Sequence, residues 1–188
     1  MKRWALLCGA LLLLAGVASA QDEKVEVFGG YSYVRADAST FGFTNDYNFN
    51  GGSGSVAVNA LPWVGFVADF GGYYWSGSGT SAGSNATVVT YMFGPKVSYH
   101  AGPIKPFVQA LFGGAHLSGT VCDEGCGSGT NNAFAMALGG GLDWNATHHL
   151  GVRLVQAEYL MTRFNIPDVS TNNQQNNVRI SAGVTFRF

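Results

Sequence analysis

The chain has 188 residues, enough for one domain, and its formal net charge of −1 with scattered charges gives no reason to expect a nucleic-acid partner. Charged residues make up only 11% of the sequence, against roughly 25% in a typical soluble domain, while aromatic residues reach 13%. Mean hydropathy is only +0.12, and the sequence shows none of the long apolar runs of a helical membrane protein. The apolar residues are instead spread thinly along the chain.

The N-terminal segment has the pattern of a secretory signal peptide. Residues 1–3 carry two positive charges, residues 4–17 are apolar, and residues 18–20 read Ala-Ser-Ala, which is a small-residue cleavage site. The apolar run is too short to span a bilayer. We therefore expect residues 1–20 to be removed after export through the Sec pathway, and residues 21–188 to form one domain.

Eight segments of the remaining chain alternate apolar and polar residues, as β-strands do when their two faces meet different surroundings. The predicted strands are Val25–Arg35, Gly54–Ala60, Val64–Trp75, Thr87–His100, Lys105–Leu117, Ala133–Asn145, Leu150–Thr162 and Asn177–Phe188. The even number is consistent with an up-and-down antiparallel barrel.

The predicted connections alternate in length along the chain. Three are tight, at residues 61–63, 101–104 and 146–149, and four are long and polar, at residues 36–53, 76–86, 118–132 and 163–176. In an up-and-down barrel this places every long loop at one rim and both chain ends at the other. Outer-membrane barrels have this asymmetry, with short periplasmic turns and longer extracellular loops.

The last predicted strand has the clearest pair of faces. Its apolar face consists of Val178, Ile180, Ala182, Val184, Phe186 and Phe188, and its other face of Arg179, Ser181, Gly183, Thr185 and Arg187. A soluble lipocalin-like barrel would face its apolar side inward and would carry many more charges outside. Tyrosines and tryptophans also gather near the predicted strand ends, as in the aromatic girdles of membrane barrels. The sequence therefore predicts an all-β, eight-stranded antiparallel transmembrane barrel.

Two predicted strands fit this pattern less well. In the seventh, Gln156 and Glu158 are out of phase with Arg153, and a bulge near Val155 would bring them back to the inner face. The fifth strand, which contains Phe107, Val108 and Phe112, does not choose a face.

The strand charges fall mostly on the small-residue face and are assigned to the barrel interior. They are Glu26, Asp69, Asp143 and Glu158 among the acids, and Lys96, Arg153, Arg179 and Arg187 among the bases. Because a lone buried charge is very costly, four acids and four bases predict an interior network of salt bridges. A narrow ion pathway, and thus a small porin, is the alternative.

Taken together, the signal peptide, the eight alternating strands, the loop asymmetry and the final Phe188 resemble the small outer-membrane β-barrel family, which includes the transmembrane domain of outer membrane protein A. The resemblance implies a barrel in the Gram-negative outer membrane, surrounded by lipid and lipopolysaccharide. It also implies that Phe186 and Phe188 form the C-terminal signal read by the barrel-assembly machinery. We expect a monomer with a structural or surface-interaction role, no cofactor, and polar loops that could bind an extracellular ligand the sequence does not specify.

Cys122 and Cys126 flank residues 123–125 in the third predicted loop. Exported proteins fold in an oxidising compartment, so a disulfide is favoured there over a metal site.

His116 and Ser118 raise the possibility of catalysis. Lipid A deacylases of similar barrel size use a His, a Ser and an acid at the lipid face, but the residues after Ser118 do not continue that family's pattern, and no acid is placed convincingly. A lipid-modifying enzyme therefore remains the alternative, and we expect neither catalytic nor metal-binding residues.

Overall fold

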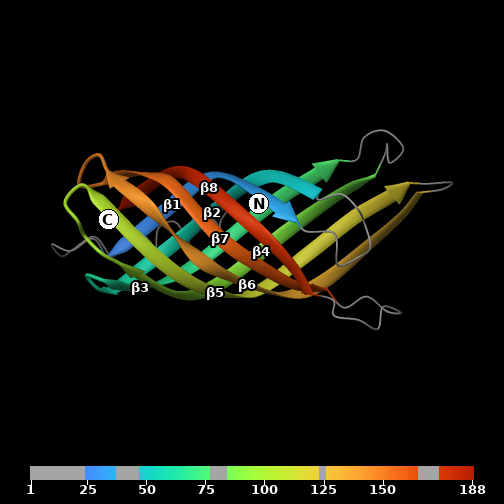
Figure 1. Ribbon diagram of the computed structural model, residues 1–188, viewed down its shortest axis with the longest axis horizontal. Coiled ribbons are helices and arrows are strands. Elements are labelled where there is room, and N and C mark those ends of the chain that lie inside the picture. Colours follow the sequence, from blue (N-terminus) through green and yellow to red (C-terminus); the bar gives the residue numbers. More distant parts are fainter. Residues whose placement is uncertain (1–23, 37–46, 77–83, 123–125, 165–173) are drawn as a thin grey trace, which may run out of the picture.

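A computed structural model describes residues 24–36, 47–76, 84–122, 126–164 and 174–188. The eight strands are β1 (Val25–Ala36), β2 (Tyr47–Leu61), β3 (Val64–Ser76), β4 (Asn85–Ser98), β5 (Ile104–Cys122), β6 (Cys126–Asn145), β7 (Leu150–Phe164) and β8 (Gln174–Arg187). Each strand pairs with its sequence neighbours, and β1 pairs with β8 to close the barrel (Figure 1). All eight pairings are antiparallel. Within the described residues, no helix is long and apolar enough to cross a membrane.

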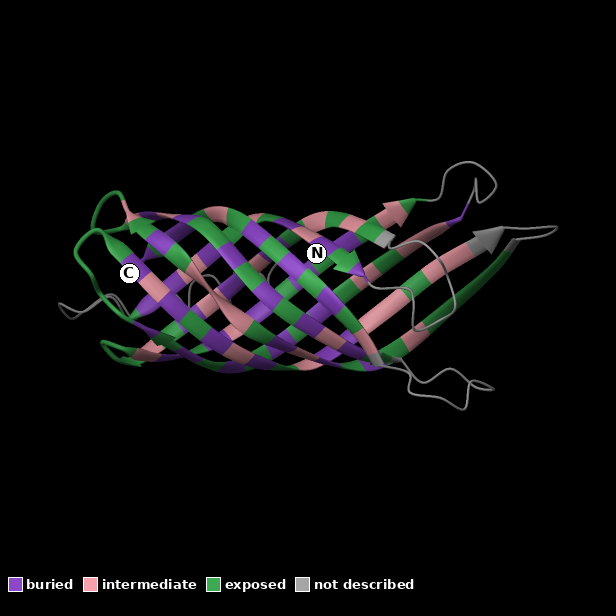
Figure 2. Ribbon diagram, in the orientation of Figure 1, coloured by how far each residue is buried: buried purple, intermediate pink, exposed green. Residues whose placement is uncertain are grey.

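Over most of the barrel wall, side chains alternate between a buried inner face and an exposed outer face, which produces the diagonal bands of Figure 2. In β4, Val89, Tyr91 and Phe93 are exposed, whereas Thr90 and Met92 are buried. The outer face is apolar and the inner face carries the polar groups, the reverse of a water-soluble barrel. The predicted fold class is confirmed.

The short connections lie together at one end of the barrel, which also holds the C-terminus (Figure 1). They comprise residues 62–63, 99–103 and 146–149. Gly102 has a φ of +64°, a conformation that favours glycine, and it lies in the turn between β4 and β5. At the opposite end, which we call the loop end, β1, β3, β5 and β7 end and β2, β4, β6 and β8 begin.

Three strand boundaries differ substantially from the predictions. β2 begins at Tyr47, so residues 47–53 are not part of a loop, and β5 and β6 continue to Cys122 and from Cys126. Most of the predicted loop 118–132 is therefore a paired β-hairpin, with 19 residues in β5 and 20 in β6. The sequence of this hairpin is rich in glycine, serine and asparagine and shows no apolar–polar alternation, because both of its faces meet water. Backbone hydrogen bonding between the two strands forms it nonetheless.

A bulge in β7 places the out-of-phase residues inside the barrel, as predicted. The register shifts between Arg153 and Gln156 in the pairing with β8, and Leu154 and Val155 are both exposed. Gln156 and Glu158 are consequently buried.

Candidate functional site

The barrel interior contains nine buried acidic and basic side chains among the described residues. They are Glu26, Asp69, Lys96, Lys105, Asp143, Arg153, Glu158, Arg179 and Arg187. The eight residues assigned to the interior from the sequence all lie there, together with Lys105, which the sequence reasoning missed. The expected balance of four acids and four bases is therefore wrong for the described residues, since the bases number five.

Arg179 connects two acids from different strands. Its Nη1 donates to Asp69 Oδ1 at 2.7 Å, and its Nε donates to Glu158 Oε2 at 2.6 Å. Tyr73 Oη accepts a further bond from Nη1 at 3.0 Å, and Gln109 Nε2 donates to Glu158 Oε1 at 2.8 Å. One guanidinium thus links β8 to β3 and to β7 across the lumen.

Around Glu26 the arrangement is reversed, because one carboxylate pairs with two lysines. Lys96 Nζ lies 2.6 Å from Oε2, and Lys105 Nζ pairs with Oε1. Asn59 Nδ2 also donates to Oε1 at 2.9 Å. This carboxylate therefore joins β1 to β2, β4 and β5.

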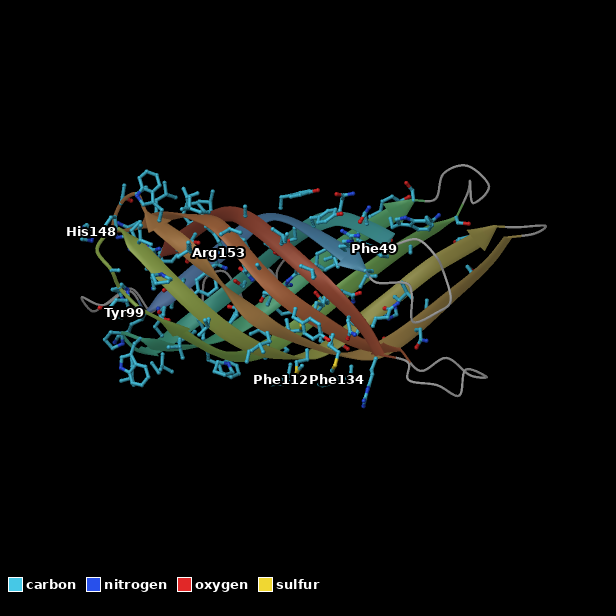
Figure 3. The ribbon with its side chains drawn as sticks, in the orientation of Figure 1. Phe49, Tyr99, Phe112, Phe134, His148 and Arg153 are labelled. Atoms are coloured by element: carbon cyan, nitrogen blue, oxygen red, sulfur yellow. The ribbon has the colours of Figure 1, made fainter. Side chains whose placement is uncertain are left out.

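The Arg153 side chain forms an ion pair and also lies over two aromatic rings. Its Nε and Nη2 donate to the two carboxylate oxygens of Asp143 at 2.7 and 3.1 Å. The guanidinium carbon lies 4.2 Å from the centroid of Phe28 and 4.4 Å from that of Phe107. Arg153 is buried and is labelled within the outline of the barrel in Figure 3, whereas the exposed Phe112 and Phe134 are labelled at its edge. Phe107 therefore resolves the facing of the fifth strand, whose inner side also carries Lys105 and Gln109.

Apolar side chains fill much of the remaining interior. The buried cluster includes Met92, Leu111 and Leu160, and Phe49 and Val88 pack against it while remaining partly exposed. An eight-stranded barrel leaves a lumen just wide enough for side chains to fill. The described interior is accordingly a packed core of paired charges and apolar groups.

The backbones of Cys122 and Cys126 lie directly opposite each other in the β5–β6 ladder. Their side chains fall outside the described part of the structure, so the disulfide stays a prediction. The predicted signal peptide, residues 1–20, also lies outside it.

His116 and Ser118 do not form a catalytic arrangement with any described acid. His116 Nδ1 lies 2.7 Å from Asn132 Oδ1, directly across the β5–β6 ladder, and the hydroxyl-bearing Ser118 is exposed. Within the described ranges, no cluster of His, Cys, Asp or Glu side chains could hold a metal ion.

Phe186 and Phe188 are exposed on the outer surface of the last strand. The backbone of Phe188 exchanges two hydrogen bonds with Val25, with N···O distances of 2.9 and 3.1 Å, and so extends the closure between β8 and β1.

The sequence model of the family described as outer membrane protein beta-barrel domain matches residues 6–188. The chain belongs to this family. This membership places the barrel in the Gram-negative outer membrane, where its exposed apolar residues face lipid.

Solved structures of small outer-membrane barrels share the fold at low sequence identity. The attachment invasion locus protein Ail of Yersinia pestis is 15% identical with a TM-score of 0.65, covering 89% of this chain and 100% of that one. Neisserial surface protein A is 14% identical with a TM-score of 0.61, covering 87% and 97%. The N-terminal barrel domain of Pseudomonas aeruginosa OprF is 15% identical with a TM-score of 0.51, covering 89% and 100%. No curated protein matches this outer-membrane barrel in sequence.

Proposed function

We propose that this outer-membrane barrel is a monomeric, non-enzymatic surface-interaction protein whose loop end binds an extracellular ligand. The main support for this proposal is the difference between the barrel interior and the loop end. The interior is filled by paired charges and apolar side chains, while β5 and β6 extend past the other strands at the loop end (Figure 1). Binding is therefore assigned to the loop end, where loops carry function on a rigid scaffold.

The proposal includes how the protein reaches this position. Residues 1–20 direct export through the Sec pathway and are removed, and Phe186 and Phe188 are recognised by the barrel-assembly machinery. The short turns then face the periplasm and the loop end faces outward, in the usual arrangement of outer-membrane barrels. The directly opposed Cys122 and Cys126 form a disulfide that stabilises the hairpin.

The surface-interaction role predicts that shortening the β5–β6 hairpin abolishes attachment. Ser118 and Thr130 are paired across the ladder, so an Asn-Gly turn can replace residues 119–129 without changing the register below. Cells of a non-adherent strain displaying the barrel should bind immobilised heparin or cultured host cells, and cells displaying the shortened variant should not. Heparin is the first probe because Ail was crystallised with a heparin analogue, sucrose octasulfate.

The matched control replaces the turn at residues 146–149, at the opposite end, and should leave attachment intact. Adding a reductant, which opens the proposed disulfide, should weaken attachment only of cells whose barrel carries the full-length hairpin. Equal attachment by the shortened variant would contradict a role for the hairpin.

The filled interior predicts that the purified barrel gives no stable current steps in planar lipid bilayers. Ion pairs join Glu26 to Lys96 and Lys105, Asp143 to Arg153, and Arg179 to Asp69 and Glu158. Apolar side chains occupy the space beside them, so we expect ions to meet no continuous polar path. Single-channel recording should match the detergent blank, with a porin as positive control. Reproducible conductance steps would instead support the small-porin alternative.

We propose no catalysis at His116 and Ser118. In the described structure, an uncharged amide, Asn132, occupies the position next to the imidazole where a catalytic acid would orient the ring.

A further inference from the structure

We infer that the open edge of β6 at the loop end pairs with the same edge of a second copy of this protein in a facing membrane. This inference rests on the orientation proposed above, with the loop end facing outward. It adds a partner that the attachment role does not name, another copy of the barrel, while the barrel stays monomeric within its own membrane.

The open edge exists because β6 is longer than the strand beside it. β6 begins at Cys126, but in the described structure β7 pairs with it only from Ala133 onward. Residues 126–132 are therefore paired with β5 on one side, and no described strand pairs with them on the other. Residues 127–130 are all exposed, and the hairpin projects past β7 at this end (Figure 1).

The ladder with β5 shows which backbone groups lie on this edge. The N–H of Asn145 donates to the carbonyl oxygen of Pro103 at 2.7 Å, and the register between the two strands has no shift. Because hydrogen-bonded pairs alternate along an antiparallel ladder, the odd-numbered residues of β6 bond to β5. The even-numbered residues direct their N–H and C=O groups the other way. On the open edge these are the groups of Ser128 and Thr130.

This edge has none of the features that keep edge strands from pairing with other chains. Natural edge strands are protected by proline, by lysine or another charged side chain, or by a bulge. Residues 126–132 read Cys-Gly-Ser-Gly-Thr-Asn-Asn, without proline or charge, and their pairing with β5 is regular. Two copies of this segment would therefore meet without charge repulsion.

A second copy fits the edge by two-fold symmetry. An axis through Gly129 sets the strand antiparallel to its copy, with Ser128 opposite Thr130 of the second copy on both sides of the axis. These two pairs exchange four backbone hydrogen bonds, and their hydroxyl side chains form a favourable cross-strand combination. Gly129 lies where the two chains approach most closely, and it has no side chain to obstruct them.

The direction of β6 places the second copy in an opposing membrane. In every copy β6 runs from the tip of the hairpin toward the barrel, so copies in one membrane present parallel strands. An antiparallel partner comes from the opposite direction, as it does when two cells or vesicles face each other. One such contact is small, but a membrane carries many copies, and their contacts reinforce one another.

The first test measures clustering of phosphatidylcholine vesicles that carry the purified barrel, by dynamic light scattering. Wild-type vesicles should cluster, and labelled vesicles without protein should stay outside the clusters. Thr130→Pro removes an N–H from the open edge but no hydrogen bond to β5, and should reduce clustering several-fold. The matched control Thr130→Ala keeps the N–H and should still cluster. The folded band on unboiled gels shows that both variants fold.

Cysteine trapping tests the register, in a background with Cys122→Ser and Cys126→Ser. A Cβ atom at Gly129 or Gly127 meets nothing within 4 Å, so either can be replaced without a clash. Gly129→Cys should form a disulfide between copies, because the two positions face each other with about 4.5 Å between their Cα atoms. Gly127→Cys should not, because its two copies are four residues apart along the strand, roughly 13 Å.

Several outcomes would overturn the inference. They are no clustering of wild-type vesicles, equal clustering by Thr130→Pro, capture of protein-free vesicles, or equal cross-linking from Gly129→Cys and Gly127→Cys. Intact clustering by Thr130→Pro with weaker binding of cells to host cells would assign the edge to an extended host segment instead. The attachment role is judged by its own assay with the shortened hairpin, and surface labelling of a loop-end cysteine in whole cells tests the orientation. Failure of either is thus distinguishable from failure of the pairing.

Discussion

Replacing Arg179 with methionine should destabilise the barrel by about 3–5 kcal/mol, the cost of breaking a buried ion pair by removing one partner. Arg179 is fully buried and donates to Asp69 and to Glu158. Without it, two carboxylates remain in the interior without this shared cation. Urea-induced unfolding in phosphatidylcholine vesicles, followed by tryptophan fluorescence and by the folded band on unboiled gels, measures the change.

Matched variants separate the charge effect from loss of packing. Asp69→Asn should cost less than Arg179→Met, because Arg179 retains Glu158 as a partner. Adding Asp69→Asn and Glu158→Gln to Arg179→Met should recover much of the lost stability, since replacing every charged member of a network is less harmful than removing one. A triple variant no more stable than Arg179→Met would show that packing, and not charge, sets the effect.

Glu26→Gln should destabilise the barrel by a similar amount, about 3–5 kcal/mol. In this case a shared anion is removed and two cations remain. The substitution keeps the size of the side chain but removes the anion shared by Lys96 and Lys105, both of which are buried. Two ammonium groups would then face each other in a medium of low polarity. The same unfolding assay measures the loss.

The lysine variants provide the control for this prediction. Lys105→Met alone should cost less than Glu26→Gln, because Glu26 retains Lys96, and the double variant Glu26→Gln/Lys105→Met should be more stable than Glu26→Gln. Equal stability of Glu26→Gln and wild type would exclude this cluster as a source of stability.

The sequence predicted the barrel because lipid and lumen impose opposite demands on alternate residues. β8 follows this rule without exception from Val178 to Arg187, and β4 follows it from Val89 to Ser98. Even the irregularity in β7 was predictable, because Glu158 would otherwise have faced lipid.

Apolar–polar alternation does not predict a strand whose two faces meet the same medium. Residues 118–122 and 126–132 lie in the paired ends of β5 and β6, where the described residues of both faces are exposed or half-buried, so no apolar–polar alternation marks them and the sequence predicts a loop there. Lys105 was missed for another reason. Its strand also directs the large apolar side chains of Phe107 and Leu111 inward, so the inner face of β5 did not look polar.

The partners inside the lumen could not be read from the sequence. Arg179 and Asp69 are 110 residues apart and lie on strands that are not neighbours. Their contact depends on the register of every strand between them, so composition predicts that charges pair but not which ones.

The position of Arg179 on β8 has a consequence for assembly. β8 is the last strand to be synthesised, and it lies between β7 and β1. Until it is in place, Glu158 and Asp69 face the interior without the cation that they share in the finished barrel. Closing the sheet therefore also brings to these two acids the cation that they share. The final strand both completes the wall and supplies the charge that makes a closed interior stable.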